Sequence, residues 1–303
     1  MAQIHTVCGL VAPEALGRTL MHEHLLCDLY RVTGSLDHLL NDEALACDEL
    51  AELTSAGGNA LVECTTLDLG RDPEGLRRIS ERTGVHIIMG AGWYRQPYYP
   101  PEIDRTATDE LAAVLTKELI EGVGGSGICA GIIGEIGTDL DYASAQEERV
   151  LRAAARAQKA TGAPLTTHAS MYPVGLTQLR ILEDEGVDPE RVIIGHCDTY
   201  LDLDYHLSIL DAGAYVQFDT VGRNHMNPDD RRAEALVELL QRGWSDRLLL
   251  SSDRCFRSDL SAFGGVGYGY VFTRFLGRLR SLGVAAADIE VLTVANPRRV
   301  LAW

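Results

Sequence analysis

The 303-residue chain is poor in positive charge. Its 27 Lys and Arg residues are outnumbered by 44 Asp and Glu residues, which gives a formal net charge of −17. An acidic surface repels nucleic-acid phosphates and anionic lipids, so we expect neither a nucleic acid nor a membrane as a partner. A locally positive pocket could still bind a small anionic molecule. The expected partner is therefore a small-molecule substrate.

Cysteine pairs and long apolar runs are also missing. The seven cysteines include no CxxC pair, and we expect them to be buried, reduced thiols. The apolar runs are too short to span a bilayer. The first residues, MAQIHTVCGL, lack the basic and apolar regions of a signal peptide. We therefore expect a cytoplasmic protein.

Eight short apolar or β-branched runs recur along the chain, separated by segments with helical periodicity. The runs are 19–26, 60–66, 85–92, 130–137, 164–169, 192–198, 214–220 and 248–253, and the predicted helices include 42–56, 144–161, 175–185, 228–242, 268–282 and 286–301. Nearly continuous hydrophobicity in each strand indicates a parallel sheet that is covered on its outside. Eight such units predict a single (β/α)8 TIM barrel domain over 1–303, with an open doubly wound sheet as the alternative.

Residues with metal-binding side chains lie at the ends of these predicted strands. They are His22, His24, Glu135, His168, His196 and Asp253. In a barrel the carboxyl ends of all strands meet at one mouth, where active sites lie. Alternate residues of a strand point to the same side, so His22 and His24 should both point into the barrel while Glu23 points away.

Imidazole and carboxylate groups are good ligands for zinc and similar divalent ions. Six ligands are too many for one tetrahedral ion but suit two ions. We expect the first two histidines and Asp253 to hold one ion and the two later histidines to hold the other. Glu135 would bridge them, and a hydroxide shared by both ions would be the nucleophile. Zinc is the expected metal, and manganese, cobalt and iron are alternatives.

The other histidines receive a structural role, because a single strand-end histidine is more often part of the core than a ligand. These are His5, His38, His86, His206 and His225. A structural explanation of the six-residue set would require six independent coincidences at corresponding strand ends. We therefore favour a metal centre for that set alone.

Several blocks resemble one known family, in the same order along the chain. GRTLMHEHLL resembles the N-terminal signature of the phosphotriesterase family of the amidohydrolase superfamily, and AGIIGEIGT, PLTTHAS, VIIGHCD, LLLSSD and VANPRRVLAW resemble its later blocks. The resemblance implies a (β/α)8 barrel, a binuclear metal centre, hydrolytic activity and the ligand roles given above. The family commonly forms dimers, so a homodimer is possible.

Glu135 departs from the pattern of the best-known members, which bridge their metals with a carbamylated lysine. The sequence looks closer to the phosphotriesterase homology proteins, which carry glutamate at this position. A glutamate is already a carboxylate and needs no carbon dioxide to become one. The departure argues against organophosphate hydrolysis as the main activity.

Residues that follow the strands are candidates for contact with the substrate. Tyr94 could donate a hydrogen bond to a carbonyl oxygen, as a similarly placed tyrosine does in the lactonase branch of the family. The alternative is that the aromatic residues of 93–99 pack beneath a loop. Arg223, Arg254 and Arg257 are candidate anion-binding residues, because barrels often bind phosphate at the last two loops. Pairing with nearby aspartates is the alternative for all three.

The expected activity is that of a lactonase or ester hydrolase acting on a small, anionic substrate such as a sugar lactone phosphate. Asp253 would accept the proton of the nucleophile and relay it toward the leaving group, or would act only as a ligand. An amidohydrolase that cleaves small N-acyl compounds is the alternative, with phosphotriester hydrolysis as a side reaction. A ligand-binding protein with structural metals is the alternative that is not an enzyme.

Overall fold

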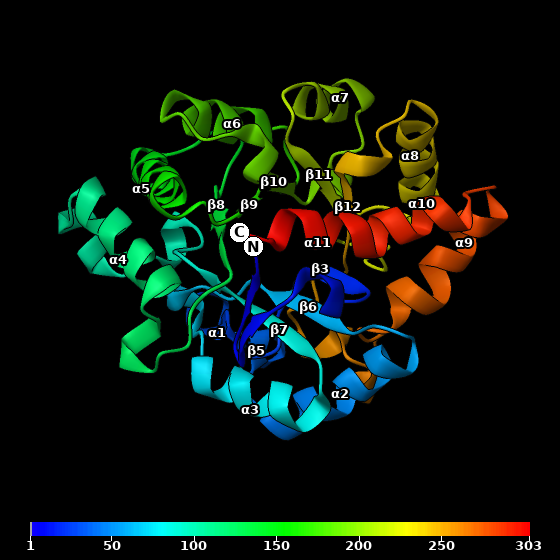
Figure 1. Ribbon diagram of the computed structural model, residues 1–303, viewed down its shortest axis with the longest axis horizontal. Coiled ribbons are helices and arrows are strands. Elements are labelled where there is room, and N and C mark those ends of the chain that lie inside the picture. The colour runs from blue at the N-terminus through cyan, green and yellow to red at the C-terminus, as the bar shows by residue number, and fades with distance from the viewer. Residues whose placement is uncertain (1) are drawn as a thin grey trace.

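The computed structural model describes residues 2–303. Its central sheet has eight parallel strands in the order β3, β6, β7, β8, β9, β10, β11 and β12 (Figure 1). Their bounds are β3 Thr19–Glu23, β6 Ala60–Glu63, β7 His86–Ala91, β8 Ile132–Gly137, β9 Leu165–His168, β10 Val192–Gly195, β11 Tyr215–Phe218 and β12 Leu248–Leu250. All eight predicted strands are present, although most end earlier than the apolar runs suggested.

The barrel closes between β3 and β12, so the alternative of an open doubly wound sheet is wrong. The N–H of Asp253 donates to the carbonyl oxygen of His22 at 3.1 Å, and the N–H of His22 donates to the Ser251 hydroxyl at 2.8 Å. The fully buried carboxylate of Glu23 accepts two backbone N–H groups from the segment after β12, each at 2.8 Å. Glu23 therefore stabilises the closing seam.

Most of the helices surround the barrel, and the last one, α11, crosses its centre in the view of Figure 1. The helices are α1 Tyr30–Thr33, α2 Glu43–Ser55, α3 Pro73–Thr83, α4 Thr108–Ile120, α5 Ala145–Thr161, α6 Gly175–Asp184, α7 Leu203–Asp211, α8 Asp229–Gln241, α9 Leu276–Ser281, α10 Ala286–Glu290 and α11 Asn296–Leu301. The predicted start of α5 is a capping box, in which Ser144 and Glu147 each accept the other's backbone N–H, at 3.3 and 2.9 Å. The last two predicted helices each contain a wider π-helical turn, at Val271–Phe275 and Val291–Ala295.

The amino ends of the strands are sealed by both ends of the chain, which lie together in Figure 1. A short hairpin, β1 Ile4–Thr6 with β2 Gly9–Val11, packs there, and the backbone of Gln3 pairs with that of Trp303 at 3.0 and 3.2 Å. The Trp303 ring stacks on His5 at 4.2 Å and donates from Nε1 to the Gly131 carbonyl at 3.0 Å. The hairpin was not predicted, since three-residue strands are too short to show a period.

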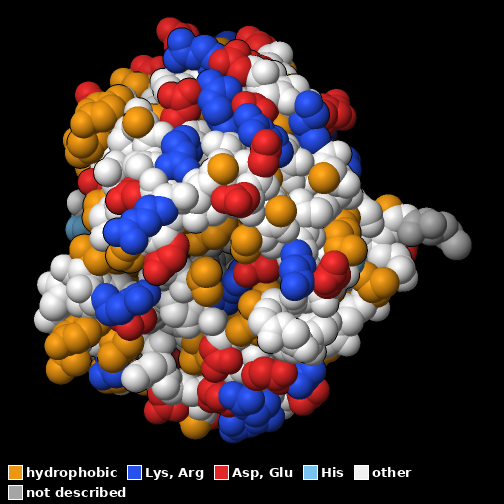
Figure 2. Space-filling view, turned by 90° about the vertical axis from the view of Figure 1, so that its left-hand side faces the viewer, with side chains coloured by type: hydrophobic (Ala, Val, Ile, Leu, Met, Phe, Trp, Pro, Cys, Tyr) orange, Lys and Arg blue, Asp and Glu red, His pale blue; other side chains and the backbone are white. Residues whose placement is uncertain are grey.

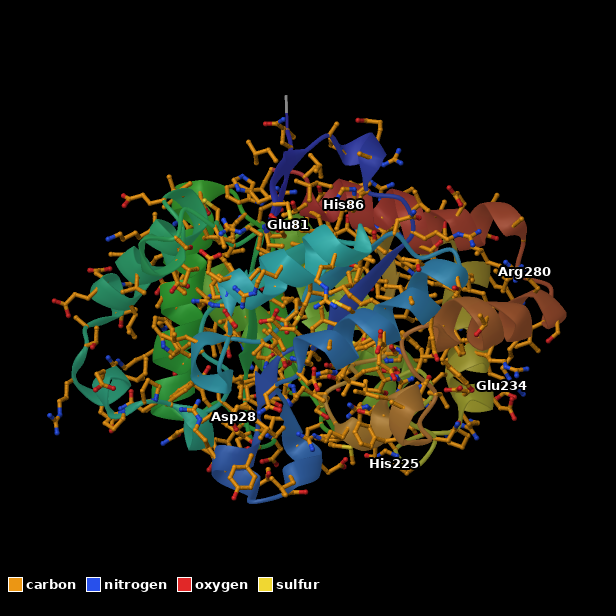
Figure 3. All side chains as sticks on the ribbon, turned by 90° about the horizontal axis from the view of Figure 1, so that it is seen from below. Asp28, Glu81, His86, His225, Glu234 and Arg280 are labelled. Carbon is orange, nitrogen blue, oxygen red and sulfur yellow. The ribbon has the colours of Figure 1, made fainter. Side chains whose placement is uncertain are left out.

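The opposite end of the barrel carries the longer loops. A second small hairpin, β4 Cys27–Asp28 with β5 Leu39–Leu40, lies in the segment after β3. Figure 3 shows His86 near the N-terminal hairpin, and Asp28 and His225 at the other end of the molecule. Acidic and basic side chains are interspersed over the face drawn in Figure 2. Within residues 2–303, no helix has the length and apolar character needed to cross a membrane.

Candidate active site

The structure brings all six predicted ligands together at the carboxyl ends of the strands. Each of them is at most 9% exposed. Two subsets, His22 with His24 and Glu135, and Glu135 with His168 and His196, have potential ligand atoms within 4.8 Å of one another. Asp253 lies beside the first subset, with its Oδ1 3.4 Å from Nε2 of His24.

Glu135 stands between the two subsets. Its Oε1 lies 3.5 Å from Nε2 of both His22 and His24. Its Oε2 lies 2.9 Å from Nδ1 of His168 and 3.3 Å from Nε2 of His196. One carboxylate oxygen therefore faces each histidine pair, which is the arrangement that a bridging ligand needs.

The donor atoms of this cluster fit metal ions. Nε2 of His22 is buried and has no hydrogen-bond partner in the described part of the chain. Nδ1 of His168 and Nε2 of His196 face each other at 2.8 Å, and one proton at most can lie between them. Buried nitrogens that lack partners are costly, and a divalent cation would satisfy them.

Asp219, at the end of β11, orients two of the histidines. Its Oδ1 lies 2.8 Å from Nδ1 of His196, and its Oδ2 lies 3.3 Å from Nδ1 of His22. Burial alone would raise the pKa of Asp219, but His196 and His22 lower it to about 2. An ionised Asp219 favours the tautomers with a proton on Nδ1, which leaves Nε2 free for a metal. Sequence reasoning missed this role, although Asp219 ends the seventh strand as other site residues end theirs.

His24 is oriented by a separate chain of hydrogen bonds. Its Nδ1 lies 2.9 Å from the Thr65 hydroxyl, which donates to Oε1 of Glu63 at 2.6 Å. Both Thr65 and Glu63 are fully buried. Nε2 of His24 is therefore the nitrogen that faces Glu135 and Asp253.

A cavity of about 240 Å³ opens above the cluster. Tyr94 lines it, and the Tyr94 hydroxyl lies 3.4 Å from Nδ1 of His168. The backbone N–H of Tyr94 donates to Oδ2 of Asp68 at 2.9 Å, which fixes the loop after β7. Tyr94 is thus both packed in the loop and placed at the cavity, so the two alternatives for it are not exclusive.

Three comparisons place this geometry among known proteins. A model of the phosphotriesterase family matches residues 2–301. The phosphotriesterase homology protein of Escherichia coli is 39% identical over 94% of this chain and 97% of that protein. Its crystal structure, with phosphate in the active site, is similar with a TM-score of 0.92, 38% identity and coverage of 95% and 99%.

The chain belongs to the phosphotriesterase family. The human N-acetyltaurine hydrolase is 32% identical over 99% of this chain and 98% of that protein. The structure of a lactonase from Listeria monocytogenes is similar with a TM-score of 0.93, 28% identity and coverage of 99% and 98%. The family resemblance and the barrel fold predicted from the sequence are confirmed. The protein is a hydrolase of a metal-dependent family, with a His/Glu/Asp cluster that could bind metal.

In this phosphotriesterase-family protein, Arg223 reaches the cavity but is engaged with other protein groups. Its Nη1 lies 3.3 Å from Oδ2 of Asp253, and its Nη2 donates to Oδ2 of Asp259 at 2.9 Å. Burial alone would raise the pKa of Asp253, but Arg223 holds it well below the usual value. The guanidinium also lies over the ring of Phe256, 4.9 Å from its centroid. Of the two possibilities for Arg223, the alternative of pairing with nearby aspartates is the one that these contacts show, and binding of an anion stays a prediction.

Arg254 and Arg257 are not among the residues that line the cavity, so the structure gives no support to their predicted contact with the substrate. Asp253 has a left-handed backbone with a φ of 50°, which turns the chain directly before Arg254. The Arg254 side chain is 1% exposed and donates to the Val221 carbonyl at 2.7 Å. Arg257 points toward the β5 segment and donates to the Leu39 carbonyl at 2.8 Å.

His38 and Arg95 line the cavity although neither was among the candidate site residues. His38 stacks on Phe256 with 4.2 Å between the ring centroids, as a packing residue would, but it also lines the cavity. Arg95, directly after Tyr94, lines the cavity as well. His206 has the expected structural role, since its Nε2 lies 2.9 Å from the Cys197 carbonyl oxygen.

Proposed function

We propose that this protein hydrolyses a carbonyl ester or lactone of a small, anionic substrate. The observation that supports the proposal most strongly is Glu135, whose two oxygens face separate histidine pairs at the floor of a cavity of about 240 Å³. A cavity of this size accommodates a small molecule and not a polymer. When bound, two divalent ions held by these residues and Asp253 would polarise the carbonyl group and lower the pKa of the attacking water.

The residues of the chain would position the substrate and move protons. The Tyr94 hydroxyl, which lies 3.4 Å from Nδ1 of His168 at the cavity, would donate a hydrogen bond to the substrate oxygen. Asp253 is the carboxylate that faces the cavity beside His24, so it would accept the proton of the attacking water and pass it toward the leaving group. Arg223 would keep Asp253 oriented for that transfer.

Amide hydrolysis is the second candidate. It is favoured by the human relative named N-acetyltaurine hydrolase, which this chain matches over nearly its whole length. Its substrate is a small N-acyl compound with an anionic sulfonate. The same Tyr94 and Asp253 placement would serve an amide carbonyl.

A substrate panel tests the proposal and separates the candidates. The metal-loaded enzyme would be assayed with γ- and δ-lactones with and without a phosphate or carboxylate, simple carboxylic esters, N-acyl amino acids, N-acetyltaurine and a phosphotriester. We expect the highest kcat/KM with an anionic lactone or ester. Turnover of N-acyl compounds alone would establish the second candidate, and a phosphotriester as the best substrate would contradict both.

The Asp253→Asn variant distinguishes an enzyme from a ligand-binding protein with structural metals. It removes the proton acceptor and keeps a similar shape. We expect turnover of the best substrate to fall by about 100-fold or more. A binding protein would show no turnover in the wild type, and its affinity for the ligand would survive the change.

A further inference from the structure

The acidic part of the substrate needs a positive partner in the cavity, and two arginines line it. Arg223 is in contact with the carboxylates of Asp253 and Asp259. Arg95 has a single ion pair in the described part of the chain, between its Nη1 and Oδ1 of Asp139 at 2.9 Å. The charge of Arg95 is therefore balanced by fewer carboxylates than the charge of Arg223.

The donors of Arg95 are also less occupied. Its Nε is buried and has no hydrogen-bond partner within residues 2–303. Asp139, its ion-pair partner, has a side chain that is 34% exposed, so solvent weakens this pair. An anion that entered the cavity could displace Asp139 and accept from Arg95 at little cost.

Arg95 is held in a fixed position beside the proposed reaction centre. Its guanidinium carbon lies 4.5 Å from the ring centroid of Tyr94 and 5.5 Å from that of Tyr98. The hydroxyl of the same Tyr94 lies 3.4 Å from Nδ1 of His168. The guanidinium and the ligand cluster therefore both contact Tyr94, which suits a substrate whose acidic group is a few bonds from its carbonyl carbon.

We propose that Arg95 is the residue that selects anionic substrates, by binding a carboxylate or sulfonate through its guanidinium group. A planar guanidinium matches the geometry of such anions and can donate to two of their oxygens. Asp139 occupies Arg95 until the substrate arrives and competes with it. This inference rests on the proposed carbonyl hydrolysis and identifies the substrate class of that site.

The test uses pairs of related substrates, in each of which one member carries an anionic group and the other carries a neutral polar group in its place. One pair is N-acetyltaurine and N-acetylethanolamine, and the other is a γ-lactone carboxylic acid and its methylamide. Arg95→Met keeps an unbranched stem over Tyr94 and removes the charge. We expect the KM of the charged member to rise by about 10- to 100-fold, the size of one lost charged hydrogen bond, with kcat and the neutral member changed less than about 3-fold.

Two further variants should change the KM for the charged substrate differently from Arg95→Met. Arg95→Lys keeps the charge without the planar fork, so its KM for the charged member should lie between those of wild type and Arg95→Met. Asp139→Asn removes the competing carboxylate, so the KM for the charged member should fall. Arg77→Met, on the surface helix α3, controls for the loss of one positive charge and should leave both substrates unaffected.

The outcomes separate a specificity role from a structural one. If Arg95→Met raised the KM of the charged and the neutral substrate equally, Arg95 would only hold Tyr94 in place, and the inference would be overturned. An unchanged KM for both substrates would overturn it as well. If Arg95→Met does not fold, as judged by its thermal transition and metal content, an unchanged or higher KM in Asp139→Asn would overturn it.

Failure of the proposed function would be seen separately, as no hydrolysis of any carbonyl substrate by the wild type. The inference would then be tested by calorimetric titration of the metal-loaded protein with taurine. Arg95→Met should weaken taurine binding by about 10-fold or more. Equal affinities in wild type and variant would contradict a role for Arg95 in anion binding.

Discussion

The two ends of the barrel use the same strands for opposite purposes. At the amino ends, His5 stacks on Trp303, and apolar side chains such as Ile4 and Leu301 fill the interior. At the carboxyl ends, buried imidazoles and carboxylates face one another around Glu135. Position along the strand therefore decides whether a histidine packs or could bind a metal.

The two ends of the barrel also contribute differently to the stability of the fold. Burial of apolar surface at the amino ends stabilises the fold by about 25 cal/mol per Å². Burial of ionisable groups at the carboxyl ends costs free energy unless partners or a cation compensate it. We therefore expect changes at the carboxyl end to affect metal and activity first, and changes at the amino end to affect stability alone.

The largest expected effect is that of Glu135→Ala at the carboxyl end. Loss of the shared carboxylate should remove at least one metal equivalent and lower kcat/KM by more than about 100-fold, since even partners of ligands typically contribute 10- to 100-fold. Elemental analysis and kinetics measure both. His86→Ala, at the amino end of β7, is the matched control and should keep the wild-type metal content. Two full equivalents in Glu135→Ala would refute the bridging role.

Asp219→Asn should have a smaller effect on the same centre. The carboxylate faces Nδ1 of His196 at 2.8 Å with one oxygen and Nδ1 of His22 at 3.3 Å with the other, whereas an amide offers only one oxygen. We expect metal affinity to fall by about 10- to 100-fold, with activity restored at high metal concentration. Metal titration with a competing chelator measures the affinity, and an unchanged value would show that Asp219 does not orient the ligands.

At the amino end, Trp303→Ala should lower stability without affecting the site. The variant loses the stack on His5 and the hydrogen bond to Gly131, so we expect the free energy of unfolding to fall by about 2–4 kcal/mol. Urea unfolding measures this free energy. Trp303→Phe keeps an aromatic ring that can stack on His5, so it should lose less stability than Trp303→Ala. Loss of metal or of kcat in a folded Trp303→Ala would break the separation between the two ends.

The last expected effect depends on pH and concerns Asp68, which accepts a hydrogen bond from the backbone N–H of Tyr94. Burial raises the pKa of Asp68 to about 6, above its value in the unfolded chain. Between about pH 4 and 6 the folded protein therefore binds a proton that the unfolded chain releases, and stability falls as pH rises. In Asp68→Asn this fall in the free energy of unfolding between pH 4 and 6, which is up to about 3 kcal/mol, should be absent. Urea unfolding of both proteins from pH 4 to 7 would show parallel profiles if the assignment were wrong.

Regular parts of the molecule were predictable from the sequence. The alternation of apolar runs and helical segments gave the barrel, and the period of two residues placed His22 and His24 together. Ser144 and Gly162 marked the ends of α5 because both act locally, as an N-cap and as a left-handed residue after the helix.

Irregular parts were not predictable, because side-chain direction there depends on backbone turns. His196 and Asp253 have left-handed backbones, with φ of 55° and 50°, so the strands end before the apolar runs do. The turn at Asp253 directs Arg254 away from the cavity. No sequence pattern indicated that Arg95 lines the cavity, because its position depends on how the loop after β7 folds.

Anomalous diffraction from crystals of the metal-loaded protein tests the central claim most directly. The account predicts two peaks at the carboxyl ends of the strands, one beside Oε1 of Glu135 with His22 and His24, and one beside Oε2 with His168 and His196. An absence of peaks at Glu135 under saturating metal, or a single ion that does not contact it, would contradict the account.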